Sequence, residues 1–207
     1  MDLEFVRDKS KGVALKYGIH IPATLPFLES ALKPRPINEI VDRALANSVV
    51  VAASYGFNKE SAFEWLNSES LVYLLSPQEL NFLSGNEENI RLFNEQVEAL
   101  YSFSWSLNQF THLDFSRECP DNLVKVYPDL IAMESDVRFR ENTKLRPVQE
   151  LIEMCDLAYC MHWGIKQADI DGVKLKTALD LFMAPERRRA LEWMLGNEEW
   201  DEVPLDT

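Results

Sequence analysis

The stretch Glu87–Phe110, EENIRLFNEQVEALYSFSWSLNQF, decides the fold. On a helical wheel its apolar side chains cover well over half of the circumference and leave only a narrow polar strip. They are Ile90, Leu92, Phe93, Val97, Leu100, Tyr101, Phe103, Trp105, Leu107 and Phe110. A helix that is apolar on most of its surface is packed on several sides. We therefore predict a central helix here, with Tyr101 and Trp105 buried.

The segments around this helix also show helical patterns. Most of the seven glycines and ten prolines fall where helices would begin or end. The predicted helices cover about 3–17, 37–55, 59–66, 77–84 and 147–170, with a last one from Pro185 to Gly196, and a short helix over Leu25–Leu32 is possible. No segment alternates apolar and polar residues over the length of a strand. The sequence predicts an all-α fold, a compact single domain over residues 1–207 with an irregular, proline-containing crossing at about 111–145.

Local signals mark several helix ends. Ser76-Pro77-Gln78-Glu79 has the spacing of a capping box with proline at the first helical position. Asn58 is placed to cap the helix that follows it, and Gly18 suits a left-handed cap. Asn86 is expected to begin the central helix, where Glu87 and Glu88 would lie at its positive end.

Composition restricts the class of protein. The chain of 207 residues carries a formal charge of −13, which disfavours nucleic acid as a partner because such binding needs a basic surface. The same charge attracts a basic protein partner, although it also serves solubility alone. With a mean hydropathy of −0.21, no apolar run long enough to cross a membrane and no signal sequence, we expect a cytoplasmic protein. Three cysteines without zinc-finger spacing indicate reduced thiols.

Arg187 breaks the amphipathic pattern of the last predicted helix. It falls between Ala190, Leu191 and Met194, inside the stripe that should face the core. A buried guanidinium needs an anion, and Asp169, Asp201 and Asp206 are candidates. The sequence leaves two interpretations open, a structural ion pair and an arginine that binds a ligand. Arg188 borders the same apolar face.

The helix over 147–170 carries a second polar group. His162 lies in the middle of its apolar arc, and Tyr159, Lys166 and Asp169 share that face. One interpretation is a pocket in which His162 acts as an acid or base, tuned by Lys166 or Asp169. The other is a hydrogen-bonded core histidine beside a lysine that reaches solvent. Trp105, Trp163 and Trp193 are the aromatic side chains expected to line this region.

The known motifs of catalysis are absent. Cys155 and His162 share a helix face, but Cys160 points elsewhere, so no tetrahedral metal site is predicted. Asp169-Ile170-Asp171-Gly172 resembles the start of a calcium loop but lacks its later ligands. There is also no nucleophile elbow and no phosphate-binding glycine loop. We expect no metal and no cofactor.

Several short segments, taken in order, resemble a bacterial family known as domain of unknown function 4272. They are Tyr17-Gly18-Ile19, Leu25-Pro26, Glu39-Ile40-Val41, Arg43-Ala44, Leu75-Ser76-Pro77 with Glu79, Val97-Glu98-Ala99-Leu100 leading to Trp105, Leu145-Arg146-Pro147, Asp156-Leu157 with Tyr159, His162-Trp163, Glu186-Arg187-Arg188 with Ala190-Leu191 and Trp193, Trp200-Asp201 and Asp206-Thr207. The resemblance covers nearly the whole chain and implies a compact, mostly helical protein without an established reaction. Cys160 departs from it, because the family usually carries arginine after the tyrosine.

Two functions follow as hypotheses. The first is a non-enzymatic binding or adaptor protein for a basic protein partner. The second is a small-molecule binder or enzyme that holds an anionic ligand near Arg187 and uses His162 as acid or base. The sequence leaves the oligomeric state open.

Overall fold

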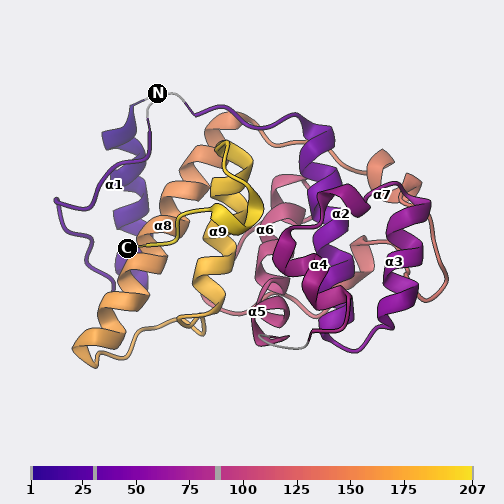
Figure 1. Cartoon of the computed structure of the whole chain (residues 1–207). Helices are drawn as coiled ribbons and strands as arrows, with labels where there is room; N and C mark the ends of the chain where they lie inside the picture. Colours follow the sequence, from indigo (N-terminus) through magenta and orange to yellow (C-terminus); the bar gives the residue numbers. More distant parts are fainter. Residues whose placement is uncertain (1, 30–31, 87–89, 207) are drawn as a thin grey trace.

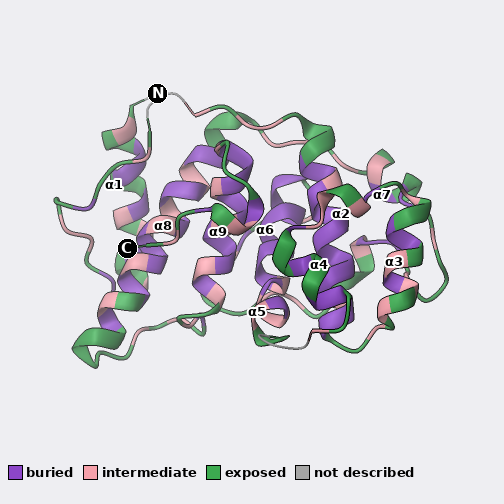
Figure 2. Cartoon of the chain, in the orientation of Figure 1, coloured by how far each residue is buried: buried purple, intermediate pink, exposed green. Residues whose placement is uncertain are grey.

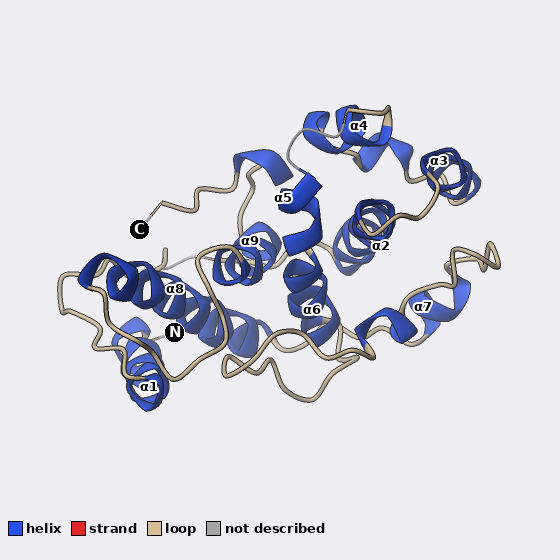
Figure 3. Ribbon diagram, turned by 90° about the horizontal axis from the view of Figure 1, so that it is seen from below, coloured by secondary structure: helices blue, strands red, loops and turns tan. Residues whose placement is uncertain are grey.

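The computed structural model describes residues 2–29, 32–86 and 90–206. Within them the chain forms helices and loops and no strand, which confirms the all-α prediction (Figure 3). The α-helices are α1 (Leu3–Ala14), α2 (Ile37–Ser54), α3 (Lys59–Ser68), α4 (Pro77–Leu83), α5 (Ile90–Glu95), α6 (Val97–Ser106), α7 (Val137–Glu141), α8 (Val148–Asp171) and α9 (Met183–Leu195). The 3₁₀ turns are η1 (Leu15–Tyr17), η2 (Val72–Leu74), η3 (Leu123–Val126) and η4 (Trp200–Glu202).

The main helices form a row whose order in space differs from their order in the chain. Contacts run from α1 to α8, then to α9, α6, α2 and α3 (Figure 1). The C-terminal helices α8 and α9 thus lie between the first helix and the middle of the chain. Figure 2 shows α2 and α6 buried over most of their surface, whereas α1 and α3 at the ends of the row have exposed faces.

The predicted central helix is present in part. All residues of α6 from Glu98 to Ser106 are buried, and Tyr101 and Trp105 are 5% and 4% exposed. The helix stops before Phe110 because Asn108 adopts a positive φ of 63°, a left-handed conformation that ends helices. At its other end Gln96 separates α6 from α5, so the prediction of one continuous helix is wrong.

The predicted caps agree with the structure where it describes them. Ser76 and Glu79 form the reciprocal capping box, and the Asn58 side chain accepts from the amide of Ser61 at 2.8 Å. Gly18 has a φ of 90° at the end of η1. Such positive φ values cost a residue with a Cβ more than they cost glycine. The predicted helix start at Glu87 and Glu88 lies outside the described residues.

Two other predicted boundaries differ. Residues 25–29 and 32 do not form the possible helix over Leu25–Leu32. The last helix begins at Met183 rather than Pro185, because the Asp180 carboxylate accepts from the amides of Phe182 and Met183 at 2.8 and 2.9 Å. An aspartate in this place supplies the acceptor that the first amides of a helix lack.

Among residues 2–29, 32–86 and 90–206, no helix combines the length and the apolar character needed to cross a bilayer.

Candidate functional site

Arg187 is fully buried between α9, α6 and the irregular crossing. Its Nε donates to Glu98 Oε2 at 2.7 Å, and its two terminal nitrogens donate to the carbonyls of Asp114 and Arg117. Its carbon Cζ also lies 5.0 Å from the centre of the Tyr101 ring. Each nitrogen of this guanidinium therefore has a protein partner. The sequence left open whether Arg187 forms a structural ion pair or binds a ligand, and these contacts favour the ion pair.

The anion beside Arg187 was predicted wrongly. None of Asp169, Asp201 and Asp206 forms this ion pair, because α9 packs on α6 and brings Glu98 to the arginine. Glu98 also accepts from the amide of Cys119 through Oε1 at 2.8 Å. The Glu98 carboxylate thus links α6 both to α9 and to the crossing.

Arg188 points away from Arg187, toward α8 and the C-terminal segment. Its Nη1 lies 3.2 Å from His162 Nδ1 and donates to the carbonyl of Asp206 at 3.0 Å. Its Nη2 donates to the carbonyl of Pro204, and Nε to Glu192 at 2.7 Å. Consecutive residues on a helix are rotated by about 100°, so neighbouring arginines serve different faces. Arg187 and His162 consequently do not meet.

His162 is 5% exposed, and its surroundings keep it neutral. Burial, together with the positive charges of Arg188 and Lys166, lowers its pKa from 6.5 to about 4. A neutral imidazole can accept the Arg188 proton at Nδ1 when its own proton is on Nε2. At neutral pH the ring is thus suited to accept from Arg188, which in turn donates to the carbonyls of the C-terminal segment.

When the pH is lowered, the native protein should lose more folding stability than a variant that lacks the His162 ring. The unfolded chain protonates His162 below pH 6.5, whereas the folded chain resists protonation down to about pH 4. The unfolded state therefore binds more protons in this window, and folding stability decreases as the pH decreases. We expect the loss due to His162 to be on the order of 2 kcal/mol.

The measurement is urea unfolding of native protein and H162Q between pH 7 and pH 4. H20Q and H112Q are matched controls, because both of these histidines are exposed. We expect the controls to follow the native pH profile and H162Q to show a shallower one. A native slope in H162Q would contradict the assignment.

The remaining predicted residues are dispersed. Lys166 and Asp169 are exposed, so their placement on a buried face is wrong; α8 extends beyond its neighbours there. Asp201 accepts from the amide of Gln78 at 3.2 Å. Trp163 is half-buried.

Two of the other predicted residues lie beside arginines. The Tyr159 ring packs against Arg188, whose Cζ lies 4.5 Å from the centre of the ring. Trp193 packs against Arg35, whose Cζ is 4.3 Å from its ring. These contacts are part of the packing around α8 and α9.

A groove of 1140 Å³ lies between α2, α6 and the irregular crossing. We call it the acidic groove. Its lining includes Val51 and Tyr55 of α2, Leu100 of α6, and Val124 and Ile131 of the crossing. Tyr55, Val124 and Ile131 are 66%, 65% and 88% exposed, so large apolar side chains stand in water along it.

The lining of the acidic groove carries an excess of negative charge. The lining contains six acidic residues and two basic ones, Lys125 and Arg138. The acidic residues are Glu95, Glu98, Glu118, Asp121, Asp129 and Glu134. Glu98 and Glu134 are engaged by Arg187 and Arg138, while Glu118 and Asp121 are exposed on the crossing.

Buried hydrogen bonds fix the outer wall of the groove. The Tyr127 hydroxyl accepts from Ser104 at 3.0 Å and donates to the Leu100 carbonyl at 3.2 Å. The amide of Cys119 donates to Glu98. Burial raises the pKa of the Cys119 thiol to about 12, so this cysteine is protonated and is a poor nucleophile. The contacts of Tyr127 and Cys119 thus hold this wall of the groove against α6.

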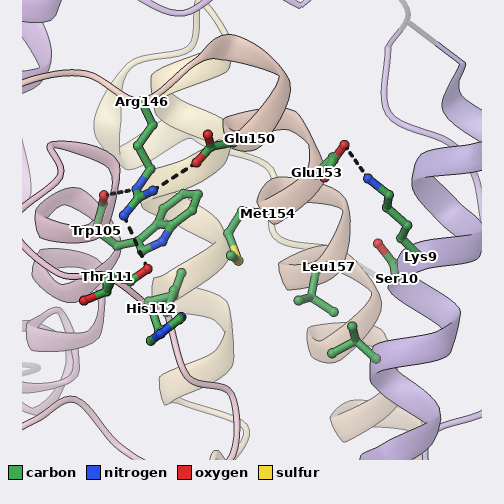
Figure 4. Close-up of a pocket in the computed structure, with 12 residues that line it drawn as sticks. Lys9, Ser10, Trp105, Thr111, His112, Arg146, Glu150, Glu153, Met154 and Leu157 are labelled. Carbon is green, nitrogen blue, oxygen red and sulfur yellow. Dashed lines mark hydrogen bonds and ion pairs between the residues drawn. The ribbon is translucent and has the colours of Figure 1, made fainter.

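A smaller pocket of 370 Å³, the Trp105 pocket, lies between α1, the end of α6, residues 111–113 and α8 (Figure 4). Its apolar lining includes Trp105, Met154 and Leu157. Two ion pairs border it. Lys9 Nζ lies 2.9 Å from Glu153 Oε1, and Arg146 Nη1 lies 2.9 Å from Glu150 Oε2.

The family model described as domain of unknown function (DUF4272) matches residues 7–203. The chain belongs to this family. No curated protein and no solved structure matches it. All lining residues of the groove and of the Trp105 pocket lie within the DUF4272 match.

Neither cavity of this DUF4272 protein was predicted from its sequence. The groove brings together α2, α6 and the crossing, and the Trp105 pocket joins α1 to α8, so no single segment carries the signal. Two buried ion pairs were also missed, Arg7 with Asp156 at 2.8 Å and Arg43 with Glu79 at 2.5 Å. Within the described ranges, no three histidine, cysteine or acidic side chains gather as metal ligands.

Proposed function

We propose that this DUF4272 protein is a non-enzymatic, cytoplasmic adaptor that binds a basic, apolar segment of a protein partner in the acidic groove. The observation that carries the proposal is the combination of exposed apolar side chains and excess acidic residues in one preformed groove. The free thiols of all three cysteines support a reducing compartment.

Apolar contacts would supply much of the affinity. Tyr55, Val124 and Ile131 stand largely in water, and covering apolar surface contributes about 25 cal/mol per Å² before the costs of association. The fixed wall reduces those costs, because Tyr127 and Cys119 are already held against α6.

Charge would select the partner. Glu118 and Asp121 are exposed beside the apolar side chains, and an acidic rim accelerates the approach of a basic partner while it repels an acidic one. The charge of −13 acts in the same direction.

The test measures binding of a labelled amphipathic leucine–lysine peptide, about four helical turns long, by fluorescence anisotropy. We expect binding that weakens with added salt, and much weaker binding of the leucine–glutamate peptide of equal length. I131D and the double variant E118K/D121K should each weaken binding at least about tenfold, a difference of roughly 1.4 kcal/mol.

Matched controls come from the exposed end of α8. I170D changes an isoleucine that is 70% exposed, and D169K/D171K reverses two exposed charges there. Neither should change the affinity. Equal binding of the two peptides, or equal losses in groove and control variants, would show that the groove is not a docking site for a basic partner.

A further inference from the structure

The hydrogen bonds of segment 203–206 come from a single side chain, that of Arg188. Its Nη1 donates to the carbonyl of Asp206 at 3.0 Å, and its Nη2 donates to the carbonyl of Pro204 at 3.1 Å. In the part of the chain that the structure describes, the segment forms no other hydrogen bond. Pro204 and Asp206 are exposed, and Leu205 is half-buried. A segment with so few contacts opens at a low free energy.

Among the described residues, the two terminal nitrogens of Arg188 donate only to uncharged acceptors. These are the two carbonyls and His162, whose Nδ1 lies 3.2 Å from Nη1. The carboxylate of Glu192 accepts from Nε, on another edge of the guanidinium. Parallel N–H groups of a guanidinium match a carboxylate, and such charge-assisted bonds are roughly twice as strong as neutral ones. The carbonyls of the segment are therefore weaker partners for Nη1 and Nη2 than a carboxylate would be.

Arg187 also donates to two carbonyls, but the crossing that carries them has further hydrogen bonds. The hydroxyl of Thr177, for example, donates to the carbonyl of Phe115 at 2.6 Å. Displacing the crossing from Arg187 would break these bonds too. Displacing segment 203–206 breaks only its two bonds to Arg188 and the apolar contacts of its side chains.

The charges around Arg188 favour a ligand with a single negative charge. Lys166 lies close enough to His162 to lower the pKa of the imidazole, whereas Glu192 pairs with Arg188 and Glu198 lies near Glu192. Positive and negative groups thus nearly balance here. Phosphate groups are recognised by clusters of arginines, while a carboxylate needs only one guanidinium.

The segment itself indicates the shape of the ligand. Its two carbonyls contact the nitrogens that a carboxylate would contact, and Leu205 between them packs against the core. The Tyr159 ring, 4.5 Å from the guanidinium carbon of Arg188, supplies an apolar wall beside these nitrogens. A ligand that replaces the segment therefore combines two acceptor oxygens with a branched apolar group.

We propose that Arg188 and His162 form an anion site that segment 203–206 covers, and that its ligand is a small carboxylate with a branched apolar group. The carboxylate replaces the two carbonyls at Nη1 and Nη2, and the apolar group replaces Leu205. Because segment and ligand use the same nitrogens, they exclude each other. The apparent affinity of the native protein is then the intrinsic affinity multiplied by the open fraction.

The probes are 4-methylpentanoate, its neutral amide and inorganic phosphate, and binding to the full chain is measured by calorimetry. L205G removes the apolar contacts of the segment and so raises the open fraction. We expect L205G to bind the carboxylate at least about tenfold more tightly than the native protein does. The amide should bind at least about tenfold more weakly than the carboxylate, because it is uncharged.

Two further variants separate the site from a general loosening of the fold. L175G is the matched control, since Leu175 is also a half-buried loop leucine that packs against the core. It should keep the native affinity. R188K/L205G keeps the positive charge but loses the planar fork, so its affinity should fall at least about tenfold below that of L205G. Melting temperatures verify that each variant is folded.

NMR relaxation tests whether the segment leaves when the ligand binds. In the native protein, the ¹H–¹⁵N NOE of the Leu205 and Asp206 amides should fall in step with the fraction of protein bound to 4-methylpentanoate. An unchanged NOE in the bound protein would show that the segment does not cover the site.

No gain of affinity in L205G, equal binding of acid and amide, or tighter binding of phosphate than of the carboxylate would each overturn the proposal. Full affinity in R188K/L205G would also overturn it. Arg188, His162 and Tyr159 do not line the acidic groove, so the groove variants I131D and E118K/D121K should bind the carboxylate as the native protein does. This proposal and the adaptor function can therefore fail independently.

Discussion

Replacing Arg187 with methionine is expected to destabilise the protein by about 3–5 kcal/mol. The change leaves the Glu98 carboxylate buried without its cation, and removing one partner of a buried ion pair has a cost of this size. The carbonyls of Asp114 and Arg117 also lose their donor. Urea or thermal unfolding followed by circular dichroism measures the effect.

R117M is the matched control, since it removes an arginine from the same region. The Arg117 side chain is 75% exposed and pairs with Asp114 at 2.9 Å, and exposed ion pairs contribute about 0–1 kcal/mol. The double variant R187M/E98Q should be more stable than R187M, because it removes the unpaired charge while an amide oxygen can still accept from Cys119. A loss in R187M no larger than in R117M would refute the structural role of this ion pair.

Local signals predicted the helix boundaries well where a single residue decides them. The Ser76–Glu79 capping box and the Asn58 cap depend on side chains within three residues of the backbone groups that they bind. Gly18 and Gly56 end helices through positive φ values of 90° and 100°. Such contacts can be predicted from the sequence because both partners lie close together in it.

The central helix shows where this local reasoning fails. Its apolar pattern continues through Leu107 and Phe110, so periodicity alone extends the helix too far. Asn108 ends it through a left-handed conformation that asparagine adopts more readily than most residues. An asparagine at this position could have indicated the end of the helix, but the apolar pattern on both sides of Asn108 favoured a longer helix.

For the candidate site, the sequence predicted correctly that Arg187 and His162 point inward, wrongly that Lys166 and Asp169 do, and not at all what the buried ones contact. Arg187 and His162 are buried as their helical faces indicated. The partner of Arg187 lies 89 residues earlier, on a helix that becomes its neighbour only through the fold. Helix faces follow from periodicity, whereas partners follow from the order α1, α8, α9, α6, α2 in space, which no single segment encodes.

Three arginines share one task in this fold, Arg7 and Arg187, which are buried, and Arg35, which is partly buried. Arg7 donates to the carbonyls of Leu25 and Pro26, and Arg35 donates to those of Trp193 and Glu198. Arg187 does the same for the crossing. Carbonyls in irregular segments lack helical partners, and a planar guanidinium can serve several at once. These contacts hold irregular segments of the chain against the helices.

Replacing Gly164 with alanine is expected to destabilise the protein by about 1–3 kcal/mol, the usual cost of overpacking a core. Gly164 lies inside α8, and an added Cβ would come within 2.8 and 2.9 Å of Ile19 Cδ1 and Cγ1, and nearer still to Cγ2. Ile19 is 3% exposed and its Cγ2 branches directly from Cβ, so it has little freedom to move aside. The clash outweighs the gain in helix propensity.

Gly12 supplies the opposite control, because it is also helical but an added Cβ there meets nothing within 4 Å. G12A should stabilise the protein by about 0.5–1 kcal/mol, since alanine favours the helix over glycine. In G164A/I19A the new methyl group occupies part of the space that Ile19 leaves, so the double variant should be more stable than the sum of its single changes by over about 1 kcal/mol. Equal stabilisation by G164A and G12A would mean that α8 and the segment after Gly18 do not pack this closely.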